Sequence, residues 1–185
     1  MKSYELSVPG VIVIEPDVFG DHRGMFMETF RRDRYVELGM RLEFVQDNFS
    51  TSTKGTLRGL HYQLLHPQGK LVFVTRGEVF DVAVDIRRDS PTFGKWCGEI
   101  LSDQNHKQMW VPPGFAHGFV VLSERALFTY LCTATYDRAA DAAIRWDDPQ
   151  LAIDWPVSAP LLSDKDACAP LIADVAPDRL PSIDG

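Results

Sequence analysis

The stretch "KLVFVTRGEVFDVAVDIR", residues 70–87, contains two apolar runs that meet at Gly77. In the second run, Phe80, Val82, Val84 and Ile86 alternate with Asp81, Ala83 and Asp85. A period of two is typical of a β-strand, because successive side chains point to opposite faces. A strand face with two aspartates is either solvated or lines a polar cavity, and a barrel offers such a cavity.

Similar short runs, rich in Val, Ile and Phe, continue on both sides of this stretch. They cover residues 11–15, 25–30, 42–50, 96–101, 107–112, 117–122 and 126–136. Many short strands separated by turn residues predict an all-β sandwich or barrel. One helix is expected at 31–39, with Gly39 as its stop signal.

Length and composition predict one soluble domain. The 185 residues suit a single domain over 1–185, with about 173–185 as an extended tail. A net charge of −7 argues against nucleic-acid binding. No apolar run is long enough for a membrane span and "MKSYELSVPG" has no signal-peptide core, so a cytoplasmic location is expected. Cys97, Cys132 and Cys168 form no CxxC pair and are expected to be small buried thiols.

The stretch "WVPPGFAHGF" places Pro112, Gly114 and His117 in the pattern P-x-G-x-x-H, which is typical of the second motif of cupin barrels. The first cupin motif would supply a metal with H-x-H, but the residue two positions after His61 is Gln63. A first-row metal usually needs three or four protein ligands, so no metal is expected.

Five longer segments carry a family resemblance. They are "FVQDNFSTSTKGTLRGLHYQ", "QGKLVFVTRGEVFDVAVDIRRDSPTFGKW", "WVPPGFAHGFVVLSE", "IRWDDPQLAIDWP" and "LSDKDACAPL". In this order they resemble the dTDP-4-dehydrorhamnose 3,5-epimerase family, from about residue 4 to 172. The resemblance implies a cupin-like double-stranded β-helix, or jelly-roll, barrel with a few short helices. It also implies an isomerase of dTDP-L-rhamnose biosynthesis that needs no cofactor.

The family inverts C3 and C5 of dTDP-4-dehydro-6-deoxy-D-glucose, whose protons beside the ketone are acidic when the enolate is stabilised. The chemistry requires a base, an acid on the opposite face and positive charge at the ketone oxygen. The resemblance implies His61 as the base, Asp166 as its partner, Tyr130 as the acid and Lys70 at the enolate oxygen. From its strand position, Asp81 is a candidate partner of Lys70 or His61.

The resemblance also implies a set of substrate contacts. Arg23 and Arg58 would bind the diphosphate, because guanidinium forks fit phosphate oxygens. The remaining contacts implied are Glu28 at the thymine, Gln46, Asp47 and Asn48 along one wall, His117 near the sugar or diphosphate, Tyr136 stacked on the thymine, and Asp141 and Lys165.

Three positions depart from the family pattern. Members often have a Tyr-Tyr doublet and a following glutamate, where this chain has Thr135, Tyr136 and Asp141. Leu131 replaces the Lys or Arg that commonly follows the catalytic tyrosine. These changes concern the base-binding wall, and therefore nucleotide selectivity more than proton transfer.

Without the resemblance, the same residues have ordinary structural interpretations. His61 would be a partly buried histidine, Tyr130 a core tyrosine and Asp166 a helix cap. Arg58 and His61 are three residues apart and would face opposite sides of a regular strand. The roles that the resemblance implies for Arg58 and His61 require both to face one cavity, so a bulge is predicted at Gly59.

Three functional classes follow. The first is the 3,5-epimerase; the second is a single-site epimerase or ketoisomerase on a related 4-keto-6-deoxy sugar nucleotide. The third is an inactive cupin that binds nucleotides or serves assembly. The resemblance further implies a homodimer with exchanged N-terminal strands, in which Arg23 and Glu28 complete the partner's site.

Overall fold

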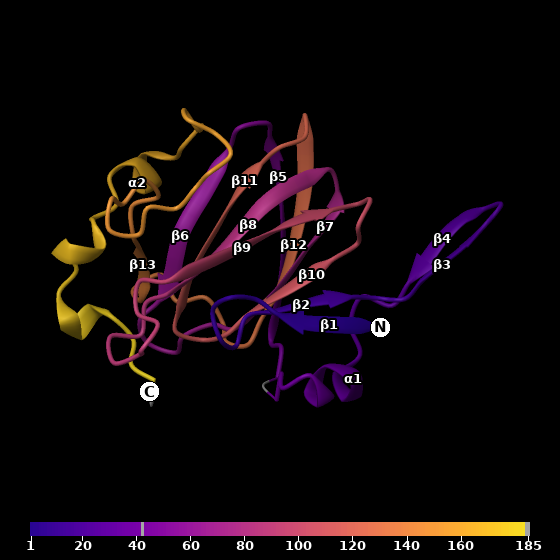
Figure 1. Ribbon diagram of the computed structural model, residues 1–185, viewed down its shortest axis with the longest axis horizontal. Coiled ribbons are helices and arrows are strands. Elements are labelled where there is room, and N and C mark those ends of the chain that lie inside the picture. The colour runs from indigo at the N-terminus through magenta and orange to yellow at the C-terminus, as the bar shows by residue number, and fades with distance from the viewer. Residues whose placement is uncertain (42, 184–185) are drawn as a thin grey trace.

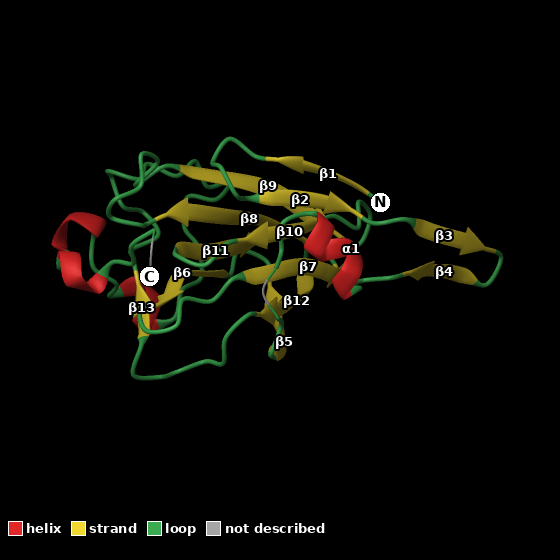
Figure 2. Ribbon diagram, turned by 90° about the horizontal axis from the view of Figure 1, so that it is seen from below, coloured by secondary structure: helices red, strands yellow, loops and turns green. Residues whose placement is uncertain are grey.

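Two β-sheets face each other in the computed structural model, which describes residues 1–41 and 43–183 (Figures 1 and 2). The larger sheet has the order β1 (Lys2–Glu5), β2 (Ile12–Glu15), β10 (Gln108–Val111), β7 (Lys70–Arg76), β12 (Arg125–Cys132) and β5 (Gln46–Thr53). The second sheet has the order β13 (Asp141–Ala143), β6 (Leu57–Gln63), β11 (Phe115–Val121), β8 (Glu78–Asp85) and β9 (Trp96–Ser102). The expected all-β, cupin-like fold is confirmed.

The alternation in β8 places one face between the sheets and the other against the C-terminal segment. Ala83 belongs to the same buried cluster as Val72 and Phe128 of the opposite sheet. Val82 and Val84 instead pack with residues of the C-terminal third, including Trp155 and Leu180. Both faces are therefore covered, and the aspartate face is interior, as a barrel-like fold predicts.

A small helix covers the outer face of the larger sheet. This helix, α1 (Arg32–Glu37), ends two residues before Gly39, close to the bounds predicted from the sequence. Its buried Tyr35 donates a hydrogen bond of 2.6 Å to Oε1 of Gln108 in β10. Phe30 and Phe44 pack beside it in the same apolar cluster, so α1 closes that side of the sheet.

The C-terminal segment is more ordered than the sequence suggested. Residues 173–183 were expected to be extended, but the structure has the 3-10 helices η1 (Ile172–Asp174) and η2 (Pro177–Arg179). Leu180 is buried against the second sheet, so apolar burial fixes this segment. Residues 184–185 of the expected tail lie outside the described residues.

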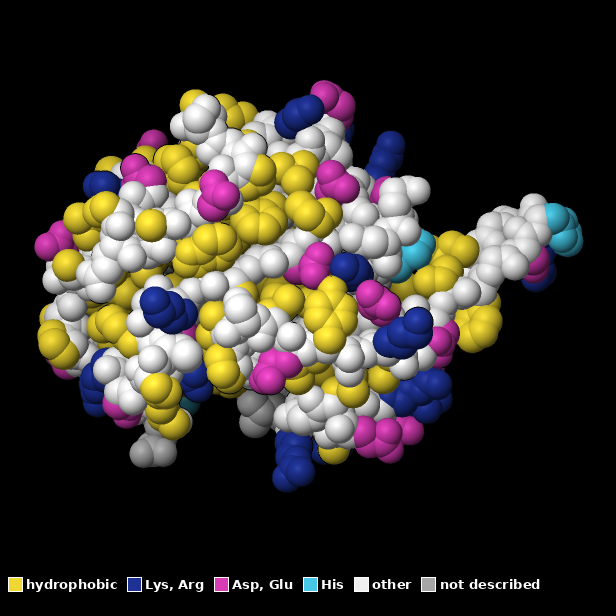
Figure 3. All heavy atoms as spheres, viewed as in Figure 1, with side chains coloured by type: hydrophobic (Ala, Val, Ile, Leu, Met, Phe, Trp, Pro, Cys, Tyr) yellow, Lys and Arg dark blue, Asp and Glu magenta, His cyan; other side chains and the backbone are white. Residues whose placement is uncertain are grey.

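The third sheet is the hairpin of β3 (Val18–Asp21) and β4 (Gly24–Met27), which stands as a narrow arm away from the body (Figures 1 and 3). Its side chains Val18, Phe19, Met25 and Phe26 are exposed. A two-stranded hairpin alone is marginally stable in water, and exposed apolar side chains of this size mark an interaction surface.

The structure can be compared with two further expectations, that the cysteines are buried and that the chain has no membrane span. Cys97 and Cys132 are buried as predicted, whereas the same prediction is wrong for Cys168, which is exposed just after α2. Among the residues described, no helix is long and apolar enough to cross a bilayer.

Candidate active site

His61 in β6 is paired with a carboxylate from a distant part of the chain. Its Nε2 lies 2.6 Å from Oδ1 of Asp166 in α2 (Asp164–Ala167), and the Asp166 side chain is only 3 % exposed. Burial alone would raise the pKa of Asp166, but hydrogen bonds from His61, Ser163 and the Gly59 amide hold that pKa below its ordinary value. An ionised carboxylate at Nε2 favours the tautomer in which Nδ1 is the basic nitrogen.

The bulge predicted at Gly59 is present. His117 of β11 pairs with His61, but Phe119 pairs with Arg58, so three steps on β6 oppose two on β11. Gly59 has a φ of +136°, and a Cβ there would lie 2.6 Å from the Cα of Gly118. Only glycine allows this approach of the two strands. The extra residue changes which way the strand faces between Arg58 and His61.

Three of the proposed catalytic residues line one cavity of about 240 Å³: His61 of β6, Lys70 of β7 and Tyr130 of β12. The cavity lies between the two sheets, because β6 belongs to one sheet and the other two strands to the second. Its other lining residues are Gln46, Asn48, Tyr62, Gln63, Gln68, Tyr136 and Asp141. The arrangement places an imidazole, an ammonium and a phenol around a space for a small polar ligand.

Burial shifts the pKa of both Lys70 and Tyr130. It lowers the pKa of Lys70 from its ordinary value, an effect opposed by Cys132 and Asp81. Burial also raises the pKa of Tyr130, so its phenol stays protonated at neutral pH and remains a proton donor.

His117 and Asp81 are paired with each other. Nε2 of His117 lies 2.9 and 3.0 Å from the two carboxylate oxygens of Asp81, and both side chains are buried. Burial raises the pKa of Asp81 and lowers that of His117. Asp81 therefore hydrogen-bonds with His117 and not with Lys70 or His61, while its charge raises the pKa of Lys70. The sheet register brings His117 beside β8, which no local sequence pattern shows.

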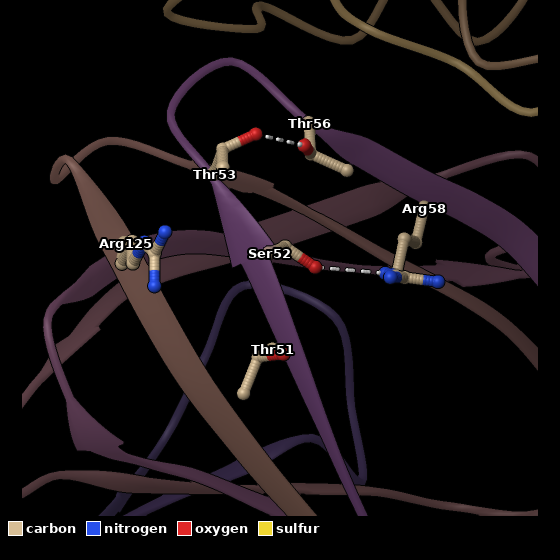
Figure 4. A pocket seen from close by; sticks show the side chains of 6 residues that line it. All are labelled: Thr51, Ser52, Thr53, Thr56, Arg58 and Arg125. Atoms are coloured by element: carbon tan, nitrogen blue, oxygen red, sulfur yellow. Dashed lines mark hydrogen bonds between the residues drawn. The ribbon is translucent and has the colours of Figure 1, made fainter.

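Arg58 lines a different pocket from His61, of about 400 Å³, at the turn between β5 and β6 (Figure 4). Its Nε donates a hydrogen bond of 3.0 Å to the hydroxyl of Ser52 in β5. The other lining residues are Thr51, Thr53, Thr56 and Arg125. Two guanidinium groups with several hydroxyls suit an anion. Sequence reasoning did not identify Arg125, which carries no motif.

The three predicted ligand contacts on β5 lie on two different faces of the strand. Gln46 and Asn48 line the cavity, and Nε2 of Gln46 donates to Oδ1 of Asn48 at 3.0 Å. Asp47, between them, is exposed and is not among the lining residues, because adjacent strand side chains point to opposite faces. The structure therefore does not bring Asp47 into this cavity.

Arg23 and Glu28 also lie away from the cavity of their own chain. Arg23, in the turn of the β3–β4 arm, forms a two-armed ion pair with Asp21, and its side chain is 79 % exposed. Glu28 forms ion pairs with Arg31 and Arg34 beside α1. Neither residue contributes to the site that contains His61 within one chain.

At the mouth of the cavity, Asp141 of β13 joins two other predicted ligand contacts. Its Oδ2 accepts a hydrogen bond of 3.1 Å from the Tyr136 hydroxyl and forms an ion pair with Nζ of Lys165. The three predicted contacts therefore meet in one cluster at the surface.

Two of the residues that depart from the family pattern, Leu131 and Thr135, are not among the residues that line the cavity. Leu131 packs in the cluster on the outer face of the larger sheet, away from the cavity, and Thr135 is exposed in the loop after β12. Sequence reasoning missed Tyr62, Gln63 and Gln68 as lining residues. For Gln63 a signal existed, because it is two residues from His61 on the same strand face.

Comparison with known proteins agrees with this geometry. Residues 5–174 match the family described as dTDP-4-dehydrorhamnose 3,5-epimerase. The chain is 56 % identical over 176 residues to the dTDP-4-dehydrorhamnose 3,5-epimerase of Pseudomonas aeruginosa, covering 94 % of this chain and 97 % of that protein.

Two solved structures are also similar. The dTDP-6-deoxy-D-glucose-3,5-epimerase of Legionella pneumophila, in complex with dTDP-4-keto-L-rhamnose, has 53 % identity and a TM-score of 0.96, over 98 % of this chain and 97 % of that one. A 3'-monoepimerase from Streptomyces bikiniensis, in complex with dTDP-quinovose, has 34 % identity and a TM-score of 0.90, over 97 % and 92 %. With the matched segment, the two-sheet fold and the His61 cavity together, the chain belongs to the dTDP-4-dehydrorhamnose 3,5-epimerase family.

Proposed function

We propose that the protein epimerises C3 and C5 of dTDP-4-dehydro-6-deoxy-D-glucose, giving dTDP-4-dehydro-L-rhamnose. The observation that carries the proposal is the cavity in which His61, backed by buried Asp166, lies with Lys70 and Tyr130. Relatives that are 44–56 % identical over most of this chain have this activity in their names.

In the proposed mechanism, His61 removes the proton from a carbon beside the ketone, and the electron pair of the C–H bond forms an enolate. The ammonium of Lys70 stabilises the negative charge on the enolate oxygen. Tyr130 then donates its phenolic proton to the opposite face of the same carbon. Solvent reprotonates Tyr130 and takes the proton from His61, so the step is redox-neutral and is repeated at the second carbon.

Deuterium incorporation tests this function. The protein is incubated in D₂O with dTDP-4-dehydro-6-deoxy-D-glucose, and the sugar is followed by NMR. Deuterium at both C3 and C5, with a new epimer, supports the proposal, and a His61→Asn variant serves as the inactive control. Undiminished turnover in that control would refute the mechanism.

A single-site reaction is the second candidate, because the similar structure from Streptomyces bikiniensis is a 3'-monoepimerase. Deuterium at C3 alone, with C5 unlabelled after complete C3 exchange, identifies that reaction. Transfer of the keto group to another carbon would identify a ketoisomerase.

We also propose that two copies form a homodimer by exchanging their N-terminal strands. The β3–β4 arm projects from the body (Figure 1). Its apolar side chains are exposed, and Arg23 lies in the turn between its two strands. Arg23 lies away from the cavity of its own chain. A guanidinium on a projecting arm could instead bind the diphosphate in the cavity of a partner chain.

Mixing two inactive variants tests the exchange. When Arg23→Ala and His61→Asn chains are refolded together, a mixed dimer has one site with both residues intact if Arg23 acts on the partner. Activity of about a quarter of wild type is then expected, from half the dimers with one intact site each. No recovery, or a monomer by light scattering with full activity, contradicts the exchange.

The cytoplasmic location expected from the sequence belongs to this proposal as a prediction. Cell fractionation with an antibody against the chain checks it, and recovery in the membrane or secreted fraction would contradict it.

A further inference from the structure

The carboxylate of Asp141 connects three parts of the chain at the mouth of the cavity. One oxygen, Oδ2, accepts from the Tyr136 hydroxyl at 3.1 Å and is paired with Nζ of Lys165. Tyr136 belongs to the loop after β12, Asp141 to β13 and Lys165 to α2. The Asp141 side chain is 18 % exposed, whereas that of Lys165 is 48 % exposed, so the carboxylate is the more enclosed partner.

On one side, this cluster continues to the cavity wall. The Tyr136 amide donates a hydrogen bond of 2.7 Å to Oε1 of Gln46 in β5. Nε2 of Gln46 then donates to Asn48 at 3.0 Å. The loop that carries the Tyr136 ring is therefore held both by Asp141 and by the wall of the cavity.

On the other side, the cluster reaches the carboxylate of the catalytic pair. Lys165 immediately precedes Asp166 in α2, which has only four residues. A single helical turn has few hydrogen bonds of its own, so its position depends on side-chain contacts. Here those contacts include the Ser163 cap, the Lys165–Asp141 ion pair, and the hydrogen bonds of the Asp166 carboxylate with His61 and with the Gly59 amide.

Asp141 thus holds two elements with different roles. Tyr136 is the residue proposed to stack on the thymine, and α2 orients the base His61 through Asp166. β13 also pairs with β6, with Asp141 opposite Gln63 and Ala143 opposite His61. Asp141 therefore lies on a strand that is hydrogen-bonded to the strand of His61.

We propose that Asp141 is a positioning residue that couples the nucleotide end of the cavity to the His61–Asp166 pair, through Tyr136 on one side and Lys165 on the other. The inference rests on the proposed function and extends it. Contact of the thymine base with Tyr136 stabilises the cluster of Tyr136, Asp141 and Lys165. This cluster in turn holds α2 in the position where Asp166 hydrogen-bonds with His61.

Steady-state kinetics of Asp141→Asn and Lys165→Met test the coupling. Both substitutions break the ion pair, so each is expected to lower kcat roughly 10–100-fold, the scale of a small misplacement of a catalytic group. The double variant is expected to be no worse than either single variant, because both remove one connection. Asp141→Glu, which restores the carboxylate, is expected to recover most of kcat.

Asp147→Asn is the matched control. Asp147 lies shortly after β13 and, like Asp141, pairs with a basic side chain, Arg145 at 2.7 Å, but both side chains are exposed and α2 is not involved. This variant is expected to keep wild-type kcat and KM.

A second readout does not depend on turnover. The ¹⁵N shifts of the His61 ring report its tautomer and its hydrogen bond to Asp166, and they are expected to change in Lys165→Met although Lys165 does not contact His61. If Asp141 contacts only the thymine base, Asp141→Asn raises KM and leaves kcat and the His61 ring shifts unchanged. The effects of Asp141→Asn and Lys165→Met on the kinetics are then additive in the double variant. That result overturns the coupling while leaving the proposed epimerase function intact. If the wild type has no epimerase activity but the His61 ring shifts still change in Lys165→Met, the proposed function is rejected and the coupling is not.

Discussion

Asp166 and His61 are 105 residues apart in sequence, yet their side chains share a hydrogen bond of 2.6 Å. The carboxylate comes from a helix of four residues and the imidazole from a strand beside a bulge. In the proposed mechanism, the buried, ionised Asp166 orients the ring and stabilises the imidazolium that forms when His61 accepts a proton.

Asp166→Asn is expected to lower kcat by about 10²–10⁴-fold, because an amide no longer enforces the productive tautomer or stabilises the charged ring. NMR assays of turnover measure the loss. Asp164→Asn, which changes an exposed carboxylate of the same helix, is the control and should stay close to wild type. Activity of Asp166→Asn within twofold of wild type contradicts the assigned role.

The same pair predicts a pH dependence of stability. Since the pKa of Asp166 is lowered from 3.8 in the folded chain, its ionised form stabilises the fold above pH 3.8. This contribution is lost as the pH falls through the lowered pKa. Wild type should exceed Asp166→Asn in free energy of unfolding by about 1–3 kcal/mol at pH 7, and the difference should shrink towards pH 3. Urea unfolding at pH 7, 5 and 3 measures it, and a constant difference is the contrary result.

Tyr130→Phe should separate proton removal from proton delivery. His61 and Lys70 remain in the cavity, so the enolate still forms and can regain a proton on its original face. In D₂O, deuterium is expected to enter the substrate with little inversion, and inversion should fall about 10²-fold or more. Unchanged inversion would show that another group is the acid.

Gly59→Ala is expected to destabilise the fold more than Gly24→Ala. The two glycines have nearly equal φ, +136° and +137°, but a Cβ at Gly24 meets nothing within 4 Å, whereas at Gly59 it meets Gly118 at 2.6 Å. Both variants should lose about 1 kcal/mol from backbone strain, and Gly59→Ala about 1–3 kcal/mol more from the strand displacement. Thermal unfolding measures the difference. Equal losses would mean that the close contact with β11 is unimportant.

Local patterns predicted much of this fold because their physical basis is local. The period of two in residues 78–86 follows from backbone geometry, and β8 forms over Glu78–Asp85. The helix near 31–39 also follows from nearby residues, through its stop signal. The bulge at Gly59 instead follows from the roles that the resemblance implies for Arg58 and His61. Resemblance added His61, Lys70, Tyr130 and Asp166, of which the first three line one cavity and the fourth pairs with His61.

Other relationships depend on which strands become neighbours. Asp81 pairs with His117 because β8 lies next to β11 in the sheet, whereas the sequence alone suggested Lys70 or His61. The C-terminal residues near Leu180 are ordered by contact with a sheet whose strands lie between Leu57 and Ala143, which no local pattern reports.

The sequence by itself therefore determined the all-β class and most of the strands, although not β1, β3 or β13, and its family resemblance supplied the groups proposed to move protons. Tertiary structure alone decided which of these groups meet: Asp166 with His61, Asp81 with His117, and Asp141 with both Tyr136 and Lys165. The physical reason is that alternation along a strand is fixed by the backbone, while a contact across a cavity is fixed by sheet order, register and the burial of apolar faces.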